Sequence, residues 1–350
     1  MPPTTTRARS SSSTRSPADT VRRAQGSPLS PRTRGVTRGL IAVTGGTGFI
    51  GQRIVARLIG AGWGVRALVR RDHSRLAALG ATTARGALED PASLERLVEG
   101  AEAVVHVAGA IAASTRRAFD AVNAEGTAQL VRAAATAESR PRVLLLSSLA
   151  ARAPHLSAYA ASKRRAEELA GAHAAGGIDL GILRPPAVYG PGDRATLPLF
   201  RQLDRGLLLA PNIAGARFSL LYIDDLAELV TRLLELPAWP ADPIEPDDGR
   251  AGGYGWAELV GIAGQTLGRR VRRIPVPRAV LWAPAALVEA GARALSRSPI
   301  LTRGKLRELY HEDWVCRGGW PQSLPDEPAR TQFQDGFART MTWYKQSQWL

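Results

Sequence analysis

The chain has 350 residues, of which 45% are hydrophobic, and a formal net charge of +15 at pH 7. This length provides enough apolar residues for one large domain or two small ones with a buried core. Its single cysteine, Cys316, excludes an internal disulfide and a thiolate metal cluster, and its five histidines show no ligand spacing, so we expect no metal site. No apolar run reaches the roughly 18–20 residues that a membrane-spanning helix needs.

About half of the excess positive charge lies at the N-terminus. Residues 1–38 contain eight arginines and one acid, Asp19, and residues 1–37 are rich in Ser, Thr, Pro and Arg with hardly any large apolar side chain. Such a segment cannot bury a core, so we predict a disordered tail at 1–37. The composition resembles a mitochondrial transit peptide, but a start codon assigned too early is the interpretation we prefer.

A second basic cluster, at residues 269–273, contains four arginines with no aromatic residue among them. Nucleic-acid binding needs a concentrated basic face, ideally with stacking aromatic side chains. We therefore interpret this cluster as a solvated surface and expect no nucleic-acid partner.

From Gly39 onward, apolar periodicity predicts strands that alternate with helices. Strands are expected at 40–43, 64–69, 104–108, 143–146 and 180–183, and helices at 49–59, 73–79, 92–97, 119–135, 159–174 and 224–236. Strands that are apolar on both faces predict a parallel sheet covered by helices on each side, which is a doubly wound α/β (Rossmann) fold. We place this dinucleotide-binding domain at 38–184. Residues 185–350 are assigned mainly to a smaller substrate-binding lobe, with segments that return to the sheet.

A glycine-rich turn, Thr44–Gly51, joins the first strand to the first helix. Gly45 permits the tight turn, Gly48 lets the backbone approach a pyrophosphate, and Gly51 lets the helix pack closely on the strand. Free N–H groups at the start of the helix complete a phosphate site. The residues expected to bind the cofactor here are Gly45, Thr47, Gly48, Phe49, Ile50 and Gly51.

The end of the second strand bears on the choice of cofactor. Val69 occupies the position where an acid would bind the ribose 2′-hydroxyl of NAD, and Arg70 and Arg71 follow it. Guanidinium groups match a 2′-phosphate better than a hydroxyl, so the pattern favours NADP(H). Asp72 keeps NAD(H) as the alternative.

Tyr159 and Lys163 stand four residues apart on one face of the predicted helix at 159–174, and Ser148 lies at the end of the fourth strand. A lysine ammonium beside a phenol lowers the pKa of the phenol, and the same lysine can hold the nicotinamide ribose. We expect Tyr159 to transfer the hydroxyl proton and Ser148 to orient the substrate oxygen, while the nicotinamide exchanges hydride. The pattern predicts an oxidoreductase acting on a carbonyl or an alcohol.

Together these motifs resemble the extended short-chain dehydrogenase/reductase family, the NAD-dependent epimerase/dehydratase group. The resemblance covers roughly residues 39–230 and is carried by Thr44–Gly51, Gly86–Leu88, His106–Gly109, Asn123–Gly126, Ser147 with Ser148, Tyr159–Lys163, Leu183–Gly192 and Tyr222–Asp225. It implies that Leu88 contacts the adenine and that Ala108 and Gly109 line the cofactor. It also implies that the loop after Arg184 closes on the nicotinamide.

Three departures from the family pattern bear on binding. Ala87 replaces a common aspartate that faces the adenine amine, while Ala187 and Phe218 replace an asparagine and an arginine of the nucleotide-sugar enzymes. The stretch Ile274–Ile300, with Trp282 among aliphatic residues, suits an apolar pocket. We therefore expect a small hydrophobic substrate, lipid- or steroid-like, with a sphingoid or ceramide-type ketone as one candidate.

Several alternatives stay open. One is a nucleotide-sugar epimerase or dehydratase, and another is a non-catalytic cofactor-binding assembly factor, against which the intact Ser148, Tyr159 and Lys163 argue. For Asn123 and Asp225 we favour structural roles, in bridging or capping helices. The run 279–295 predicts an amphipathic helix on the core or along a pocket, with a membrane surface as the alternative. We expect a cytoplasmic protein and leave peripheral membrane contact and a homodimer open.

Deletion of residues 1–37 should leave folding and cofactor affinity intact, because this segment has almost no apolar side chains to contribute to a core. Thermal unfolding and cofactor titration of the truncated and full chains provide the measurement. An insoluble truncated protein, or one that no longer binds cofactor, would contradict the expectation.

Overall fold

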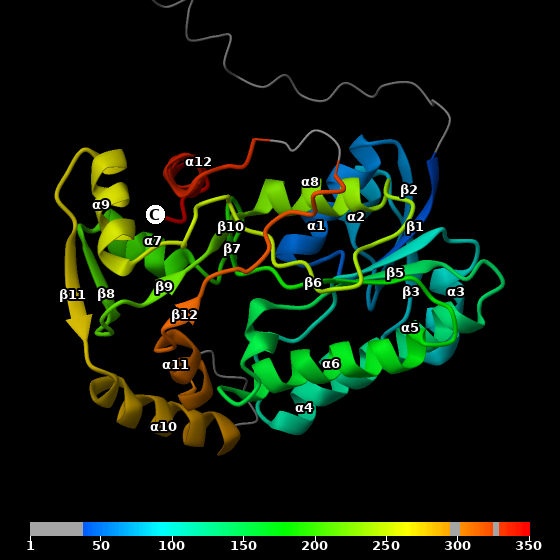
Figure 1. Cartoon of the computed structure of the whole chain (residues 1–350), viewed down its shortest axis with the longest axis horizontal. Coiled ribbons are helices and arrows are strands. Elements are labelled where there is room, and N and C mark those ends of the chain that lie inside the picture. Colours follow the sequence, from blue (N-terminus) through cyan, green and yellow to red (C-terminus); the bar gives the residue numbers. More distant parts are fainter. Residues whose placement is uncertain (1–37, 295–301, 325–328) are drawn as a thin grey trace, which may run out of the picture. The chain divides into compact units, whose positions relative to one another are not determined.

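The computed structural model describes residues 38–294, 302–324 and 329–350. The tail predicted at 1–37 therefore lies outside the described residues. At the centre of the described chain is a six-stranded sheet (Figure 1). Its strands are β1 (Arg38–Thr44), β2 (Trp63–Val69), β3 (Thr82–Arg85), β4 (Ala103–His106), β5 (Arg142–Leu146) and β6 (Leu180–Leu183).

The strand order is β3-β2-β1-β4-β5-β6, and every pairing is parallel. The chain therefore moves outward in one direction from β1 to β3, returns to the middle, and moves outward in the other direction from β4 to β6. In such sheets, ligands bind beyond the carboxyl ends of the strands where the direction reverses, here between β1 and β4. The doubly wound α/β fold predicted from the sequence is confirmed.

Successive strand residues alternate between two apolar cores, because side chains along a strand point to opposite faces. Ile41 and Val43 belong to one core with side chains of α1 (Phe49–Gly60), α2 (Ser74–Leu79) and α8 (Ile223–Leu233). Ala42 belongs to the other core. That core is built with α3 (Pro91–Val98), α5 (Gly126–Thr136) and α6 (Ala158–Ala174). Figure 1 shows α1 and α8 above the sheet and α5 and α6 below it.

Two local features differ from the prediction. The helix expected at 119–135 is divided into α4 (Arg116–Asp120), a π-helical turn η3 (Ala121–Glu125) and α5. Strand β3 was not predicted, because its sequence TTAR contains no large apolar residue and lies largely exposed on the edge of the sheet. Edge strands need only one buried face and often lack an apolar run.

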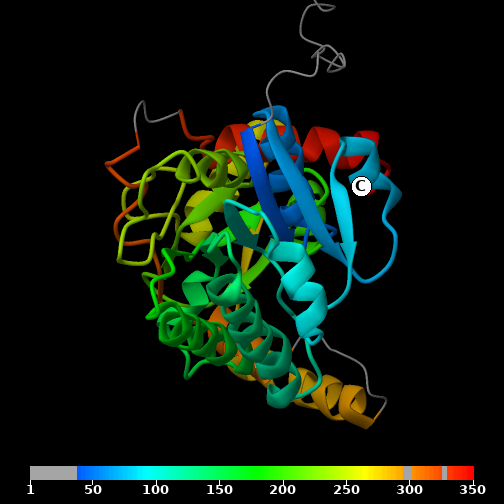
Figure 2. The same cartoon turned by 90° about the vertical axis from the view of Figure 1, so that its right-hand side faces the viewer.

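The C-terminal part adds three parallel two-stranded pairs. These join β7 (Ala187–Tyr189) to β10 (Leu220–Tyr222), β8 (Leu207–Pro211) to β11 (Arg272–Val276), and β9 (Arg217–Phe218) to β12 (Asp313–Trp314). The helices here are α7 (Leu197–Asp204), α9 (Trp256–Leu267), α10 (Arg278–Ala294), α11 (Arg303–Leu309) and α12 (Phe333–Gln346). Figure 2 shows α10 extending beyond its neighbours on one side.

A third core in this part is built largely of aromatic rings, in contrast to the aliphatic cores on the sheet. It contains Tyr189, Phe200, Tyr222, Tyr254, Phe333, Phe337 and Tyr344, all of them buried. Two segments also reach the large sheet: α8 packs on α1, and Ile244 forms a parallel bridge with Leu183 of β6. The domain boundary at 184 stays a prediction.

No helix among the described residues is long and apolar enough to cross a membrane. Within the same residues, no group of three or more His, Cys, Asp or Glu side chains could hold a metal ion.

Candidate active site

The glycine-rich turn after β1 leaves no room for side chains at two positions. Gly45 has a φ of +69°, and a Cβ there would lie 2.6 Å from the backbone nitrogen of Ala108. A Cβ on Gly51 would lie 2.1 Å from the carbonyl oxygen of Gly45. At Gly48 a Cβ would meet nothing closer than 3.4 Å, so the protein itself does not require glycine there. An exposed glycine that packing does not require fits a position where a ligand approaches the backbone.

Helix α1 begins at Phe49 with no side chain capping it and no acid in its first turn. The first N–H groups of a helix have no partner within the helix, and they carry partial positive charge. Thr47 and Gly48 are exposed beside them, whereas Phe49 and Ile50 are half-buried. This uncapped helix start, with its open glycine, fits the pyrophosphate of a dinucleotide.

A buried histidine connects the glycine-rich turn to the neighbouring strand and helix. His106 of β4 contacts the Thr44 hydroxyl through Nδ1 at 2.6 Å and the Thr127 hydroxyl through Nε2 at 2.9 Å. The Thr127 hydroxyl donates to the carbonyl of Asn123 at 2.6 Å, so it accepts from His106, and Thr44 must donate to Nδ1. Burial and, to a smaller extent, the charge of Lys163 lower the pKa of His106 to about 3. His106 is therefore neutral and structural.

Asn123 holds the loop after β4 against helix α6. Its side chain accepts from the Ala110 nitrogen at 2.7 Å and donates to the Ala110 carbonyl at 3.0 Å and to the Ser162 hydroxyl at 2.9 Å. Asn123 thus bridges this loop and α6, a contact of the structural kind expected from the sequence. Asp225 likewise bonds within the protein, but it accepts from the nitrogen and hydroxyl of Thr331 instead of capping its own helix.

Ser148, Tyr159 and Lys163 come together beyond the carboxyl end of β5. The Lys163 ammonium donates to the carbonyl of Leu146, the last residue of β5, at 2.9 Å. Burial lowers the pKa of Lys163 to about 8, while the nearby carboxylate of Glu167 opposes this change. A Cβ on Gly109 would lie 3.2 Å from the same ammonium, so Lys163 borders the loop that is expected to line the cofactor.

The phenol of Tyr159 differs from the expectation in one respect. Burial raises its pKa above 10.0, while a hydrogen bond with Ser148 and the charge of Lys305 lower it in part. The expected lowering by Lys163 is not found, because that ammonium is directed to the Leu146 carbonyl. The raised pKa favours the protonated form of the phenol.

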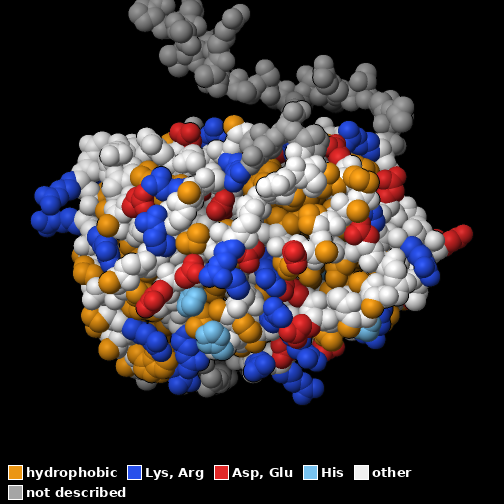
Figure 3. All heavy atoms as spheres, in the orientation of Figure 1, with side chains coloured by type: hydrophobic (Ala, Val, Ile, Leu, Met, Phe, Trp, Pro, Cys, Tyr) orange, Lys and Arg blue, Asp and Glu red, His pale blue; other side chains and the backbone are white. Residues whose placement is uncertain are grey.

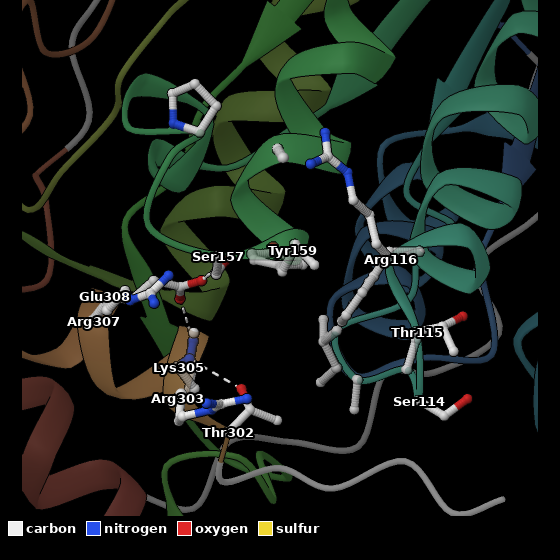
Figure 4. A pocket seen from close by; sticks show the side chains of 18 of the residues that line it. Ser114, Thr115, Arg116, Ser157, Tyr159, Thr302, Arg303, Lys305, Arg307 and Glu308 are labelled. Carbon is white, nitrogen blue, oxygen red and sulfur yellow. Dashed lines mark hydrogen bonds and ion pairs between the residues drawn. The ribbon is translucent and has the colours of Figure 1, made fainter. Parts of the chain in front are cut away.

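A cavity of about 600 Å³ opens beside Tyr159 (Figure 4). Ser157 and Tyr159 from the start of α6 lie between α11, which carries Lys305 and Glu308, and the segment that precedes α4. Several basic side chains line the cavity together with apolar ones; the lining includes Ile111, Ala112, Ala113, Arg116, Phe119, His155, Arg303, Lys305, Arg307 and Glu308. Trp282 and the other α10 side chains that the structure describes, at 278–286 and 288, do not line it, contrary to the expectation for 274–300, of which 295–300 lie outside the described residues.

The remaining predicted cofactor residues lie along the same edge of the sheet. Arg70 and Arg71 directly follow β2 and are exposed, and neither makes a hydrogen bond or ion pair with another described residue. Leu88 is buried against Gly126. A Cβ added to Gly126 would lie 2.9 Å from the Leu88 side chain. Gly192, which follows β7, lies near the start of α1, where a Cβ added to it would lie 4.0 Å from the Phe49 ring.

A buried ion pair between Arg184 and Glu167 holds helix α6 in place. The Arg184 guanidinium binds both carboxylate oxygens of Glu167, at 3.0 and 2.6 Å. Ser147 donates to the same carboxylate, and Glu245 lies 3.7 Å from Arg184. Glu167 is one helical turn beyond Lys163, so the pair fixes α6 relative to the ends of β5 and β6.

Sequence reasoning missed Glu167, Arg184 and the pair Lys305 and Glu308 as parts of this site. One signal could have pointed to Lys305. Only three of the 46 basic residues are lysines, namely Lys163, Lys305 and Lys345. Because arginine supplies nearly all of the basic side chains in this chain, a lysine is a candidate for a functional role.

Comparison with known proteins identifies the family. The profile of the NAD dependent epimerase/dehydratase family matches residues 41–243. The chain is 37% identical over 318 residues to a ceramide reductase of Caulobacter vibrioides, covering 89% of this chain and 96% of that protein. The chain therefore belongs to this family and is an NAD(P)-dependent oxidoreductase of the extended short-chain dehydrogenase type.

A second relative is a 2-alkyl-3-oxoalkanoate reductase of Shewanella oneidensis, 30% identical over 211 residues, which are 53% of this chain and 54% of that protein. Among solved structures, MoeE5 in complex with UDP-glucuronic acid and NAD has a TM-score of 0.65 at 20% identity, covering 89% of this chain and 100% of that one. The UDP-glucose 4-epimerase of Thermus thermophilus has a TM-score of 0.60 at 22% identity, covering 87% and 99%. At this identity the two structures show the fold alone.

Replacement of Arg184 by Met should destabilise the protein by about 3–5 kcal/mol, because it leaves the carboxylate of Glu167 buried without its main counter-charge. The double variant Arg184→Met with Glu167→Leu should recover part of this loss. Urea unfolding gives the free energies. Arg164→Met, which removes an exposed ion pair with Glu168 on the same helix, is the control and should cost under about 1 kcal/mol. Equal losses at Arg164 and Arg184 would contradict the assigned role.

Proposed function

We propose that this protein is a reductase that uses NADPH to convert a ketone on a long-chain, apolar substrate to an alcohol, with a sphingoid or ceramide-type ketone as the specific candidate. The observation that carries the proposal is the position of the Tyr159 phenol, which bonds to Ser148 at the wall of a cavity. Reduction of a carbonyl needs a proton donor at this position, and a phenol with a raised pKa keeps its proton at neutral pH.

In the proposed reaction Ser148 and Tyr159 both donate hydrogen bonds to the substrate carbonyl oxygen. Tyr159 then transfers its proton to that oxygen as negative charge develops there. Lys163 lies at the cofactor side, next to Gly109, where its ammonium can hold the nicotinamide ribose. A reduced nicotinamide, when bound, supplies the hydride.

Three observations support an apolar substrate. The relatives that match the chain by sequence include a ceramide reductase and a 2-alkyl-3-oxoalkanoate reductase. The side chain of Phe218 packs against Trp256 with ring centroids 4.7 Å apart, so no polar group replaces the arginine of the nucleotide-sugar enzymes. The adjacent Arg217 cannot take that role, because it binds the carbonyls of Gly252 and Gly253 at 2.5 and 2.6 Å.

The cavity wall suggests how such a substrate lies. Ile111, Ala112, Ala113 and Phe119 provide an apolar surface on one side, and the basic side chains of α11 face them. We propose that the alkyl part contacts the apolar side and that the polar groups near the ketone face α11. The alternative, a nucleotide-sugar epimerase or dehydratase, would need polar side chains that bind a diphosphate at the positions of Ala187 and Phe218.

Kinetics across a series of N-acyl 3-ketosphinganines of increasing chain length test this substrate class. Activity (kcat/KM) should rise with length until the cavity is full, because each buried methylene contributes up to about 0.8 kcal/mol. Tyr159→Phe keeps the ring but removes the proton donor, so turnover should fall by about 100-fold or more with cofactor binding retained. Activity that is flat with chain length, together with tight binding of a UDP- or dTDP-sugar, would favour the epimerase alternative.

The preference for NADP(H) over NAD(H) is part of the proposal. It is supported by Arg70 and Arg71, which are exposed at the end of β2 and free to meet a 2′-phosphate. Arg70→Ala should weaken NADPH binding roughly 10- to 100-fold and leave NADH binding nearly unchanged, because a charge-assisted contact contributes about 1.5–3 kcal/mol. Fluorescence titration with both cofactors measures the difference. Equal losses for NADPH and NADH would contradict the phosphate assignment.

We further propose that the outer face of α10 rests on an anionic membrane. Val280 and Val288 on this face are 60% and 46% exposed, and their exposed neighbours Ala279, Ala283 and Pro284 carry no charge. Arg278 at the start of the helix is basic, and Figure 3 shows basic and apolar side chains side by side in the region of α10 and α11. Apolar residues with adjacent basic groups suit an anionic lipid surface.

Flotation with phosphatidylglycerol vesicles should recover the full chain, and Val280→Glu with Val288→Glu should abolish recovery, because each charge would have to enter the interface. Leu209→Glu, at an apolar β8 residue that is 53% exposed, is the control and should float as before. Unchanged flotation of the α10 variant would contradict this contact. The homodimer stays a prediction.

A further inference from the structure

We propose that Lys305 and Glu308 of α11 are positioning residues that set the proton affinity of Tyr159 from the C-terminal part of the chain. The reductase function proposed above supplies the reaction in which this matters. The pair itself is inferred from geometry alone.

Helix α11 is docked on the first turn of the catalytic helix. Ser157 caps α6, where its hydroxyl accepts from the Ala160 nitrogen at 2.9 Å, and it donates to the Glu308 carboxylate. At Gly304, a Cβ would lie only 3.0 Å from the Cβ of Ser157, so the two elements are in close contact. Tyr159 lies in this same first turn. The position of α11 relative to the phenol is therefore fixed through the cap of α6.

The Lys305 ammonium and the Glu308 carboxylate occupy different positions relative to Tyr159 and the cavity. The Lys305 ammonium lies 5.8 Å from the centre of the Tyr159 ring and 2.8 Å from Oε2 of Glu308. Both side chains line the cavity, but that of Lys305 is 56% exposed and that of Glu308 only 8%. The cation thus faces the cavity beside the phenol, and the anion lies behind it, oriented by Ser157 on one oxygen and Lys305 on the other.

Three other charged side chains near the phenol, those of Lys163, Arg116 and Arg307, have partners of their own. Lys163 on the same helix donates to the Leu146 carbonyl, and Arg116 on the opposite wall is 72% exposed beside Asp120. Arg307 stacks over the Trp282 ring at 5.7 Å. His155, after η4 (Leu149–Arg152), and Arg303 also line the cavity.

Electrostatics agree with this arrangement. Burial raises the pKa of Tyr159, the Ser148 hydrogen bond lowers it, Lys305 lowers it and Glu308 raises it. Among charged side chains, the lysine and the glutamate therefore act on the phenol with opposite signs. A cation about 6 Å away stabilises the phenolate, and its neighbouring anion limits that effect.

The proposal is tested by titrating the tyrosine Cζ carbons in the full chain by ¹³C NMR, in the presence of saturating NADP⁺. The resonance that disappears in Tyr159→Phe identifies the residue. Lys305→Met should move its titration midpoint up by roughly 0.5–1.5 pH units, and Glu308→Gln should move it down by a similar amount. The matched control is Lys345→Met. Lys345 is equally exposed, at 55%, and pairs with Asp204 outside the cavity, so its loss should leave the midpoint unchanged.

The pH dependence of kcat provides a second measurement. Reduction needs the protonated phenol, so the rate should fall as pH rises through the pKa of Tyr159. This fall should occur at higher pH in Lys305→Met and at lower pH in Glu308→Gln, with KM for NADPH unchanged. A purely structural role would lower activity without moving the two midpoints in opposite directions.

Midpoints in both variants that equal the Lys345→Met control, or that move in the same direction, would overturn the proposal. If activity does not rise along the ketone series but the two NMR midpoints still move in opposite directions, the proposed substrate is rejected. The proposed role of Lys305 and Glu308 is then kept. The NMR measurement requires only a folded chain with bound NADP⁺, so the two failures are distinguishable.

Discussion

A lysine ammonium buried at the carboxyl edge of the sheet is the constraint on which the rest of the site depends. Lys163 is 6% exposed, and a buried charge is costly unless its surroundings compensate it. The Leu146 carbonyl provides a direct acceptor, and Glu167 provides a counter-charge one turn further along the helix. That carboxylate is itself buried and requires Arg184.

The ion pairs that stabilise these buried charges continue into the C-terminal part of the chain. Arg184 lies near Glu245, Glu245 pairs with Arg152 at 3.1 Å, and Arg152 also binds the carbonyls of Asp313 and Val315. One series of ion pairs therefore connects the catalytic helix to the strand that follows α11. Such a network favours a single arrangement, because removal of Arg184 would leave the buried carboxylate of Glu167 without its main partner. This explains how an irregular C-terminal segment is held accurately beside Tyr159.

The cofactor side is organised by neutral groups. His106 is buried and uncharged, and its two nitrogens join Thr44 of the glycine-rich turn to Thr127 of α5. Asn123 extends this connection through the Ala110 backbone to Ser162 on α6. The glycine-rich turn and the helix that carries Tyr159 are thus coupled through hydrogen bonds that involve no surface side chain. The cavity beside Tyr159, in contrast, is lined by long basic side chains together with apolar ones.

The sequence alone determined the doubly wound sheet and the positions of Ser148, Tyr159 and Lys163, because these follow from local patterns: apolar runs, a glycine turn and a four-residue spacing on a helix. The edge strand β3 and the π-turn at 121–125 were not predictable, since TTAR has no apolar run and the turn keeps a helical pattern. Tertiary structure decided what no spacing could show. It directed the Lys163 ammonium to a carbonyl instead of the phenol, placed Trp282 outside the cavity, and brought Lys305 to Tyr159 from a distant part of the chain. These outcomes depend on how distant segments pack, and the energy of a buried charge is known only when its neighbours in space are known.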